Sequence, residues 1–218
     1  MKQRVWDSPT RLFHWALVVL VALSWWTAET GRDSLHLWFG YGVLFLLFFR
    51  ILWGFAGSST SRFAAFIRGP RAVVQYVRSG FRWPLAGHAP LGALSVLALL
   101  VLLVAQVGTG LFAMDEDGLF GGSLAHLASV GTSDRLTELH EDMFDWLLIL
   151  IGLHILAILL YRLVLGRKLL GPMITGRADL PRGMEPMRPA TPLVAIVCTL
   201  LAMAATAWIV FGAPPLGT

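Results

Sequence analysis

Long apolar stretches alternate with short polar segments along this chain. An α-helix needs roughly 20 predominantly apolar residues to cross the hydrocarbon core of a bilayer. Five stretches qualify, at approximately residues 10–28, 36–56, 90–113, 142–165 and 192–212. The pattern therefore predicts an all-α integral membrane protein with five spanning helices.

Ser8 and Pro9 mark the beginning of the first span. A serine ahead of a helix can cap its free N–H groups, and proline is favoured at the first helical position. We therefore expect Ser8 to cap this helix. A cleaved signal peptide is not expected, because the apolar run contains His14 and tryptophans and no small-x-small cleavage pattern follows it.

The composition supports the membrane interpretation. Of 218 residues, 56% are hydrophobic and 14% are charged, whereas soluble domains carry about 25% charged residues. A soluble core of this size could not bury so much apolar surface, so lipid is the expected solvent for much of the chain. The single cysteine, Cys198, permits no internal disulfide, and there is no Cys-x-x-Cys-His sequence. Any haem would therefore be held non-covalently.

The charges predict an orientation. Of the 17 lysines and arginines, all but Arg32 and Arg135 lie on the side of the N-terminus. By the positive-inside rule we expect a cytoplasmic N-terminus and a C-terminus on the outer side of the membrane. This explains the net charge of +4 without nucleic-acid binding. The outer face carries ten acidic residues: Glu29, Asp33, Asp115, Glu116, Asp117, Asp134, Glu138, Glu141, Asp142 and Asp145.

Three connecting segments have distinct compositions. The basic loop 58–89 is expected to carry a short amphipathic helix, about 71–78, lying on anionic lipid headgroups. The outer loop 114–139 is expected to hold a short helix around 123–130. Residues 171–191 contain four prolines and are expected to form a flexible cytoplasmic linker between a bundle, residues 1–170, and the fifth span.

Four histidines fall into two layers. His140 and His154 share a helix face, because fourteen residues advance to about 40° short of four turns, but they lie about 21 Å apart along the axis. They cannot bind one metal ion, since metal–nitrogen bonds are about 2 Å long. His14 is expected at the depth of His154, towards the cytoplasm, and His36 at the depth of His140, towards the outside.

A pair of axial imidazoles in each layer suits haem b, because the porphyrin supplies the other four nitrogens. Zinc would need two more protein ligands per layer. We therefore favour two stacked haems, ligated by His14/His154 and His36/His140. Histidines that only form interhelical hydrogen bonds remain the alternative. His88 and His126 are not expected to be ligands, although His126 could serve a quinone or proton-transfer site.

Small and basic residues near these histidines admit two interpretations each. Gly40, Gly42 and Gly152 could let a macrocycle approach a helix, or could serve ordinary helix packing. Four arginines could pair with haem propionates or could extend to the membrane interface as isolated charges. They are Arg11, Arg50 and Arg162 on the inner side and Arg32 outside.

Four sequence stretches then suggest a family. "RLFHW" in the first span, "LHLWFGYGVLFLLFFRILWGF" in the second, and "LHE" and "GLH" at the fourth resemble the bacterial cytochrome b561 family over about residues 4–176. This family includes the b-type subunits of nickel–iron hydrogenases. The resemblance implies a four-helix transmembrane bundle with two b haems on His14, His36, His140 and His154. The fifth span, 192–212, departs from it and would be an anchor or packing helix, or a docking helix for a partner subunit.

The resemblance also implies electron transfer between ubiquinone or ubiquinol and a periplasmic carrier or dehydrogenase. An acidic outer face would attract a basic c-type cytochrome and repel the superoxide anion. We therefore rank transfer between the quinone pool and a cytochrome above a superoxide:quinone oxidoreductase activity. A non-redox membrane anchor or transporter is the alternative of another class. The sequence is also compatible with a quinone oxidoreductase activity and with a homodimer.

Overall fold

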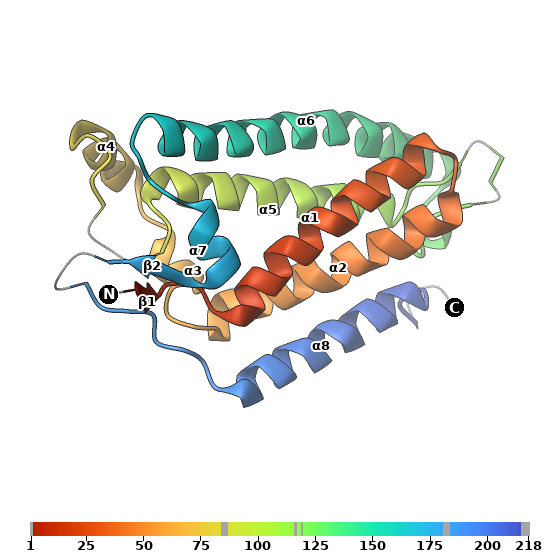
Figure 1. Ribbon diagram of the computed structural model, residues 1–218. Helices are drawn as coiled ribbons and strands as arrows, with labels where there is room; N and C mark the ends of the chain where they lie inside the picture. Colours follow the sequence, from red (N-terminus) through yellow and green to blue (C-terminus); the bar gives the residue numbers. More distant parts are fainter. Residues whose placement is uncertain (1, 84–86, 116, 119, 181–183, 215–218) are drawn as a thin grey trace. The chain divides into compact units, whose positions relative to one another are not determined.

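Five long helices dominate the computed structural model, which describes residues 2–83, 87–115, 117–118, 120–180 and 184–214. They are α1 (Ser8–Glu29), α2 (Asp33–Ala56), α5 (Pro90–Gly110), α6 (Val130–Leu163) and α8 (Pro192–Val210). Each is long and apolar enough to cross a membrane (Figure 1). The prediction of an all-α membrane protein with a fifth C-terminal spanning helix is confirmed.

The shorter elements precede or connect these helices. They are β1 (Lys2–Arg4), α3 (Phe63–Phe66), α4 (Pro70–Arg78), a 3₁₀-helix (Ala125–Leu127), α7 (Leu170–Thr175) and β2 (Arg177–Asp179). The amphipathic helix expected at 71–78 is present as α4. The helix expected around 123–130 is reduced to one 3₁₀ turn.

The segment expected to be a flexible linker is partly structured, so that prediction is wrong for its first part. It contains β2, which pairs with β1 in an antiparallel ribbon (Figure 1). Further along, the Met187 N–H donates to the carbonyl of Arg4 at 3.0 Å, and the Ser59 N–H donates to the carbonyl of Arg188 at 3.0 Å. Backbone hydrogen bonds to distant segments thus order the described parts of this connection.

Asp7, not Ser8, caps α1. The Thr10 N–H donates to Asp7 Oδ1 at 2.7 Å, and Ser8 is the first helical residue. Asp7 Oδ2 accepts hydrogen bonds from Trp53 Nε1 and Ser61 Oγ, both at 3.1 Å, and from Ser58 Oγ. The carboxylate therefore satisfies a free helix N–H while it joins the start of α1 to the end of α2 and the loop that follows.

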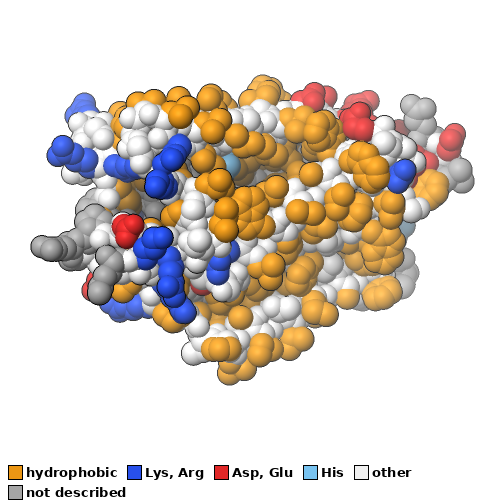
Figure 2. All heavy atoms as spheres, viewed as in Figure 1, with side chains coloured by type: hydrophobic (Ala, Val, Ile, Leu, Met, Phe, Trp, Pro, Cys, Tyr) orange, Lys and Arg blue, Asp and Glu red, His pale blue; other side chains and the backbone are white. Residues whose placement is uncertain are grey.

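The chain forms two compact units. The first, here the basic unit, comprises residues 1–13, 50–99 and 150–198, and the second, the acidic unit, comprises residues 14–49, 100–149 and 199–218. The basic unit holds 15 of the 17 lysines and arginines and three acidic residues, whereas the acidic unit holds two basic and ten acidic residues. In the basic unit, Lys and Arg side chains gather around α4, α7 and β2 (Figure 2). In the acidic unit, Asp and Glu side chains gather near the start of α6.

Large apolar side chains cover the outer faces of the long helices (Figure 2). Phe55 is 72% exposed, Trp146 64% and Leu163 78%. Such surfaces are expected where lipid is the solvent, since soluble monomers rarely expose large contiguous apolar patches.

α6 begins at residue 130, twelve residues before the predicted apolar run. Its 34 residues span about 51 Å, longer than the hydrocarbon core of about 30 Å, because its polar first turns are also helical.

Candidate functional site

His36 and His140 face each other within the acidic unit. His36 lies in the first turn of α2, and His140 lies ten residues into α6. Their ring centroids are 6.1 Å apart, and the ring planes are nearly perpendicular at 89°. The structure therefore brings together the two histidines that the sequence places in the outer layer.

Both rings use Nδ1 to bond a backbone carbonyl of a neighbouring helix. His36 Nδ1 lies 2.9 Å from the carbonyl oxygen of Ser24 in α1, and His140 Nδ1 lies 2.8 Å from that of Gln106 in α5. A carbonyl oxygen only accepts, so Nδ1 must carry the hydrogen in both rings and Nε2 keeps its lone pair. Metal-binding histidines commonly have this arrangement, in which the second nitrogen fixes the tautomer and the ring orientation.

The separation of the two rings suits one iron between them. Metal–imidazole bonds are about 2 Å long and the ring centroid lies about 1 Å beyond the nitrogen, so two axial imidazoles have centroids about 6 Å apart. The observed 6.1 Å agrees with this distance. No group of three or more His, Cys, Asp or Glu side chains within the described residues could hold a bare metal ion. The donor set fits a porphyrin-bound iron better than zinc.

Two glycines shape the surroundings of these rings. A Cβ atom on Gly110 would lie 2.7 Å from Cε1 of His140, so any larger residue there would displace the imidazole. A Cβ on Gly40, one turn after His36, would meet no atom within 4 Å, so there is open space on this side of α2. Gly42 instead faces Leu20, at 2.9 Å from its Cδ1, and therefore serves helix packing.

Three polar residues around the histidine pair were not identified from the sequence as parts of the site. Ser24 and Gln106 supply the two carbonyls, and Thr109 Oγ1 lies 3.3 Å from His140 Nδ1. A signal for two of them exists: Gln106 and Thr109 are polar residues one turn apart in the 90–110 stretch, whose only other polar side chain is that of Ser95. Polar side chains in a spanning helix usually bond to a neighbouring helix.

The model of the prokaryotic cytochrome b561 family matches residues 5–176 of the chain. The chain belongs to the prokaryotic cytochrome b561 family. It is therefore a b-type membrane cytochrome of electron transfer and a multi-pass membrane protein. The match ends before α8, which adds a fifth helix to the family's region. No curated protein and no solved structure gives a significant match.

The other two predicted haem ligands of this cytochrome lie in different units. His154 belongs to the basic unit, where its Nδ1 is 3.2 Å from Oγ of Ser95 in α5. This contact again leaves Nε2 available to a ligand. His14 belongs to the acidic unit, where its ring packs edge-on against Trp15 with centroids 4.9 Å apart. The pairing of His14 with His154 stays a prediction.

The two remaining histidines of the cytochrome have other surroundings. The His88 ring packs against the rings of Trp6 and Phe66, with centroids 4.6 and 4.7 Å away. His126 is exposed, and a Cβ on Gly212 would lie 3.2 Å from its Cε1. The expectation that neither histidine is a haem ligand stays a prediction.

Of the four arginines considered for haem propionates, Arg50 is the buried one, at 2% exposure. Its guanidinium lies over the ring of Phe63, 4.9 Å from the centroid, and 5.8 Å from that of Phe66. Within the described part of the chain its Nη1 has no hydrogen-bond partner. Arg11 instead bonds the carbonyl of Ile174, Arg32 lies over Trp26, and Arg162 is exposed. Arg50 is therefore the strongest candidate to hold an anionic group of the cofactor.

Proposed function

We propose that this cytochrome binds two b haems and carries electrons across the bacterial inner membrane, between the quinone pool and a periplasmic redox partner. His36 and His140 would ligate one haem, and His14 and His154 the other. The observation that carries the proposal is the His36–His140 pair, with centroids 6.1 Å apart and both Nδ1 atoms bonded to carbonyls. The haem-binding bundle would comprise residues 1–170, with 171–191 as the connection and 192–212 as an added helix.

The haem would supply the one-electron chemistry, and the chain would supply ligation, orientation and an apolar environment. The carbonyls of Ser24 and Gln106 keep the Nε2 atoms of His36 and His140 deprotonated. The same hydrogen bonds fix the orientation of both rings. His140 and His154 share a face of α6 about 21 Å apart, so two haems would lie at different depths.

The charge distribution favours a basic outer partner. The acidic unit carries ten carboxylates and two arginines, a balance that would attract a basic protein such as a c-type cytochrome. The same field would repel superoxide, so a superoxide:quinone oxidoreductase activity ranks second. The arginines of the basic unit favour a cytoplasmic N-terminus and a periplasmic C-terminus by the positive-inside rule.

A non-redox anchor or transporter is the proposal of another class. Membership of the cytochrome family disfavours it. It predicts a colourless purified protein, and histidines that only bond other helices. The absorption spectrum of the full chain before and after dithionite therefore separates the two classes in one measurement.

Haem counting tests the ligand assignment. The full chain is expected to bind two haems. H36A and H140A should each lose one haem, and the reduced spectrum and midpoint potential of the lost haem should be the same in both variants. H14A and H154A should each lose the other haem. H88A and H126A are matched histidine controls that should retain both. One haem per chain, or different haems lost in H36A and H140A, would refute the pairing.

The partners are tested on the haem-loaded protein. Ubiquinol should reduce the haems, and a basic c-type cytochrome should reoxidise them at a rate that falls with ionic strength. Superoxide should reduce them more slowly than ubiquinol does. Rapid reduction by superoxide, with no transfer to cytochrome c, would favour the second-ranked activity.

A further inference from the structure

A cavity of about 580 Å³ lies within the basic unit, and none of the four proposed haem ligands belongs to its lining. It is lined by β1, the first turns of α1, the end of α7, β2, and the start of α8. Three arginines contribute to its wall: Arg4, Arg11 and Arg177. The remaining lining is largely apolar and includes Trp6, Trp53, Met187, Pro192, Ala195 and Ile196.

Arg4 and Arg177 are directly opposite each other in the β1–β2 ribbon. Residues opposite each other on antiparallel strands project to the same side, with Cβ atoms about 5 Å apart, and like charges in such positions destabilise the pairing. Both residues are exposed. The salt bridge that the structure gives for the described residues, Arg188 with Glu185, involves neither of them. An anion between the two guanidinium groups would remove the repulsion.

Arg11 adds a third cation whose position is fixed. Its guanidinium donates to the carbonyl of Ile174 and, at 3.2 Å, to Ser8 Oγ. Its Nε is buried and has no hydrogen-bond partner among the described residues. Gly176 allows this approach: its φ is +76°, and a Cβ there would lie 3.1 Å from Arg11 Nε and 2.8 Å from the carbonyl oxygen of Trp6.

Asp7 also contributes to the wall, but its carboxylate is already saturated. Oδ1 accepts from the Thr10 N–H, and Oδ2 accepts from the side chains of Trp53, Ser58 and Ser61. It therefore leaves the three arginines without a direct acidic partner. The cavity keeps a net positive wall.

The apolar part of the lining belongs to the ends of spanning helices. Pro192, Ala195 and Ile196 form the first turns of α8, and Pro9 and Arg11 those of α1. Cations at the end of an apolar span lie at the level where hydrocarbon gives way to headgroups. A ligand that satisfies the whole wall has a phosphate for the arginines and a hydrocarbon chain for the start of α8.

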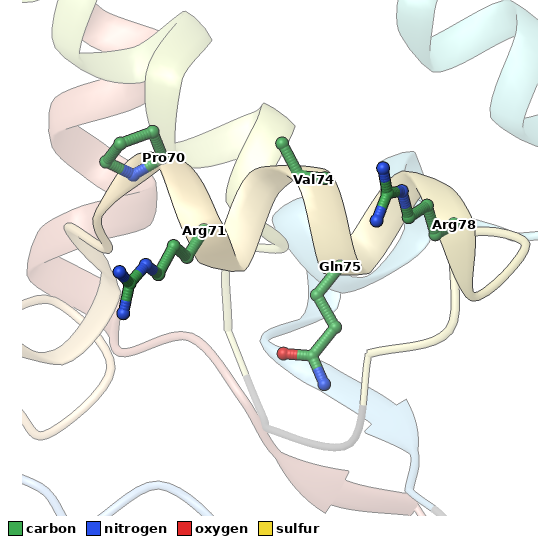
Figure 3. Close-up of a pocket in the computed structure, with 5 residues that line it drawn as sticks. All are labelled: Pro70, Arg71, Val74, Gln75 and Arg78. Atoms are coloured by element: carbon green, nitrogen blue, oxygen red, sulfur yellow. The ribbon is translucent and has the colours of Figure 1, made fainter.

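We propose that this cavity binds the phosphate group of an anionic membrane phospholipid, with Arg4 and Arg177 on either side of the phosphate and Arg11 behind it. Basic pockets between spanning helices are suited to anionic headgroups. A second cavity, of about 440 Å³, is a weaker candidate (Figure 3). Its lining residues, including Arg71 and Arg78, all come from α4, so it is one exposed helix face and not a pocket between elements.

The test uses the purified, haem-loaded full chain in a neutral detergent. Phosphatidylglycerol and phosphatidylcholine are titrated separately, and bound lipid is counted by native mass spectrometry. The R4Q/R177Q variant should bind phosphatidylglycerol at least tenfold more weakly, since each basic side chain near a headgroup adds roughly fivefold in affinity. The R68Q/R82Q control removes two exposed arginines of the same unit from outside the cavity and should change affinity less than threefold.

A stability measurement separates binding from misfolding. Without anionic lipid, R4Q/R177Q should melt at or above the temperature of the parent, because the variant loses a repulsive pair. With phosphatidylglycerol, the parent should gain stability and the variant should not. Equal losses of affinity in both variants would overturn the site, because they would show a diffuse charge effect. Displacement of phosphatidylglycerol by millimolar inorganic phosphate would assign the cavity to a free phosphate and overturn the lipid.

Discussion

Gln106 and His140 are joined by two hydrogen bonds that run in opposite directions. The side-chain Nε2 of Gln106 donates to the backbone carbonyl of His140 at 2.7 Å, and Nδ1 of His140 lies 2.8 Å from the backbone carbonyl of Gln106. One bond fixes the backbone of α6 against α5, and the other fixes the tautomer of the imidazole. The pair thus sets both the position and the chemistry of a proposed ligand.

Replacement of Gln106 by leucine tests the first of these bonds. The Q106L side chain leaves the carbonyl of His140 without its donor, while the backbone carbonyl that fixes the tautomer remains. We expect both haems to be retained and the unfolding free energy to fall by about 1 kcal/mol. Thermal unfolding followed at the Soret band measures this, with Q75L on the exposed face of α4 as the control. A complete loss of one haem in Q106L would contradict a purely positional role.

Gly110→Ala should act directly on the His140 ring. The added Cβ would lie 2.7 Å from Cε1 of His140, closer than van der Waals contact permits. We expect weakened axial ligation of one haem, seen as partial haem loss or a high-spin component in the spectrum. Gly108→Ala is the matched control, since a Cβ there meets nothing within 4 Å. Equal effects of the two substitutions would mean that helix flexibility, and not the contact with His140, matters.

The nearly perpendicular rings of His36 and His140 predict a spectroscopic signature. Perpendicular axial imidazoles leave the low-spin ferric d orbitals close in energy, which gives a highly anisotropic electron paramagnetic resonance signal. We expect this signal in the oxidised parent and its loss in H36A and H140A. An ordinary rhombic spectrum from that haem would show that the rings rotate when the cofactor binds.

The acidic start of α6 should control the reaction with a basic partner. Neutralisation of three exposed carboxylates beside His140, in E141Q/D142N/D145N, is expected to slow electron transfer to a basic c-type cytochrome several-fold at low salt. The difference should shrink at high ionic strength, because salt screens the attraction. D179N/E185Q removes carboxylates from the basic unit and is the control. A rate that does not depend on salt in the parent would contradict electrostatic docking.

Tyr76 belongs to α4, outside the spanning helices, and makes a pH-dependent contact with Tyr161 of α6. Burial and the 2.8 Å hydrogen bond to Tyr161 raise the pKa of the Tyr76 phenol well above its usual value near 10. The group then contributes stability that is complete below pH 10 and is lost as the pH rises beyond it. We expect at least one of the three tyrosines to resist ionisation at pH 11 in an ultraviolet titration, and Y76F to lose that late phase. Complete ionisation of all three below pH 11 would refute this.

The spanning helices could be predicted from the sequence because lipid imposes one requirement, an apolar run of sufficient length. The start of α6 could not, because most of its first twelve residues are polar although all of them are helical. The prediction used apolarity, which marks the hydrocarbon core and not the end of a helix. Asp7 and Ser8 are equally good capping residues by type. The choice between them depends on Trp53 and Ser61, whose positions next to Asp7 arise only from the tertiary structure.

The histidine pair was predictable in part. Helical periodicity relates His140 to His154, and the depth within each span relates His140 to His36. The carbonyls that fix the two rings belong to Ser24 and Gln106, and a backbone carbonyl leaves no trace in a sequence pattern. The β1–β2 ribbon was also missed, since three-residue strands separated by more than 170 positions give no periodic signal.

The surroundings of His36 and His140 bear on how this protein is assembled. α2 and α6 carry the two rings, and α1 and α5 carry the carbonyls that orient them. Four helices must therefore be inserted and packed before the pair acquires its geometry, and α6 is the last of them to leave the ribosome. Stable haem capture at this pair would consequently be a late event in biogenesis and would report completion of the four-helix assembly. A chain that ends before α6 is expected to remain in the membrane without that cofactor, whereas a chain that ends before α8 already contains every residue of the pair and its supports.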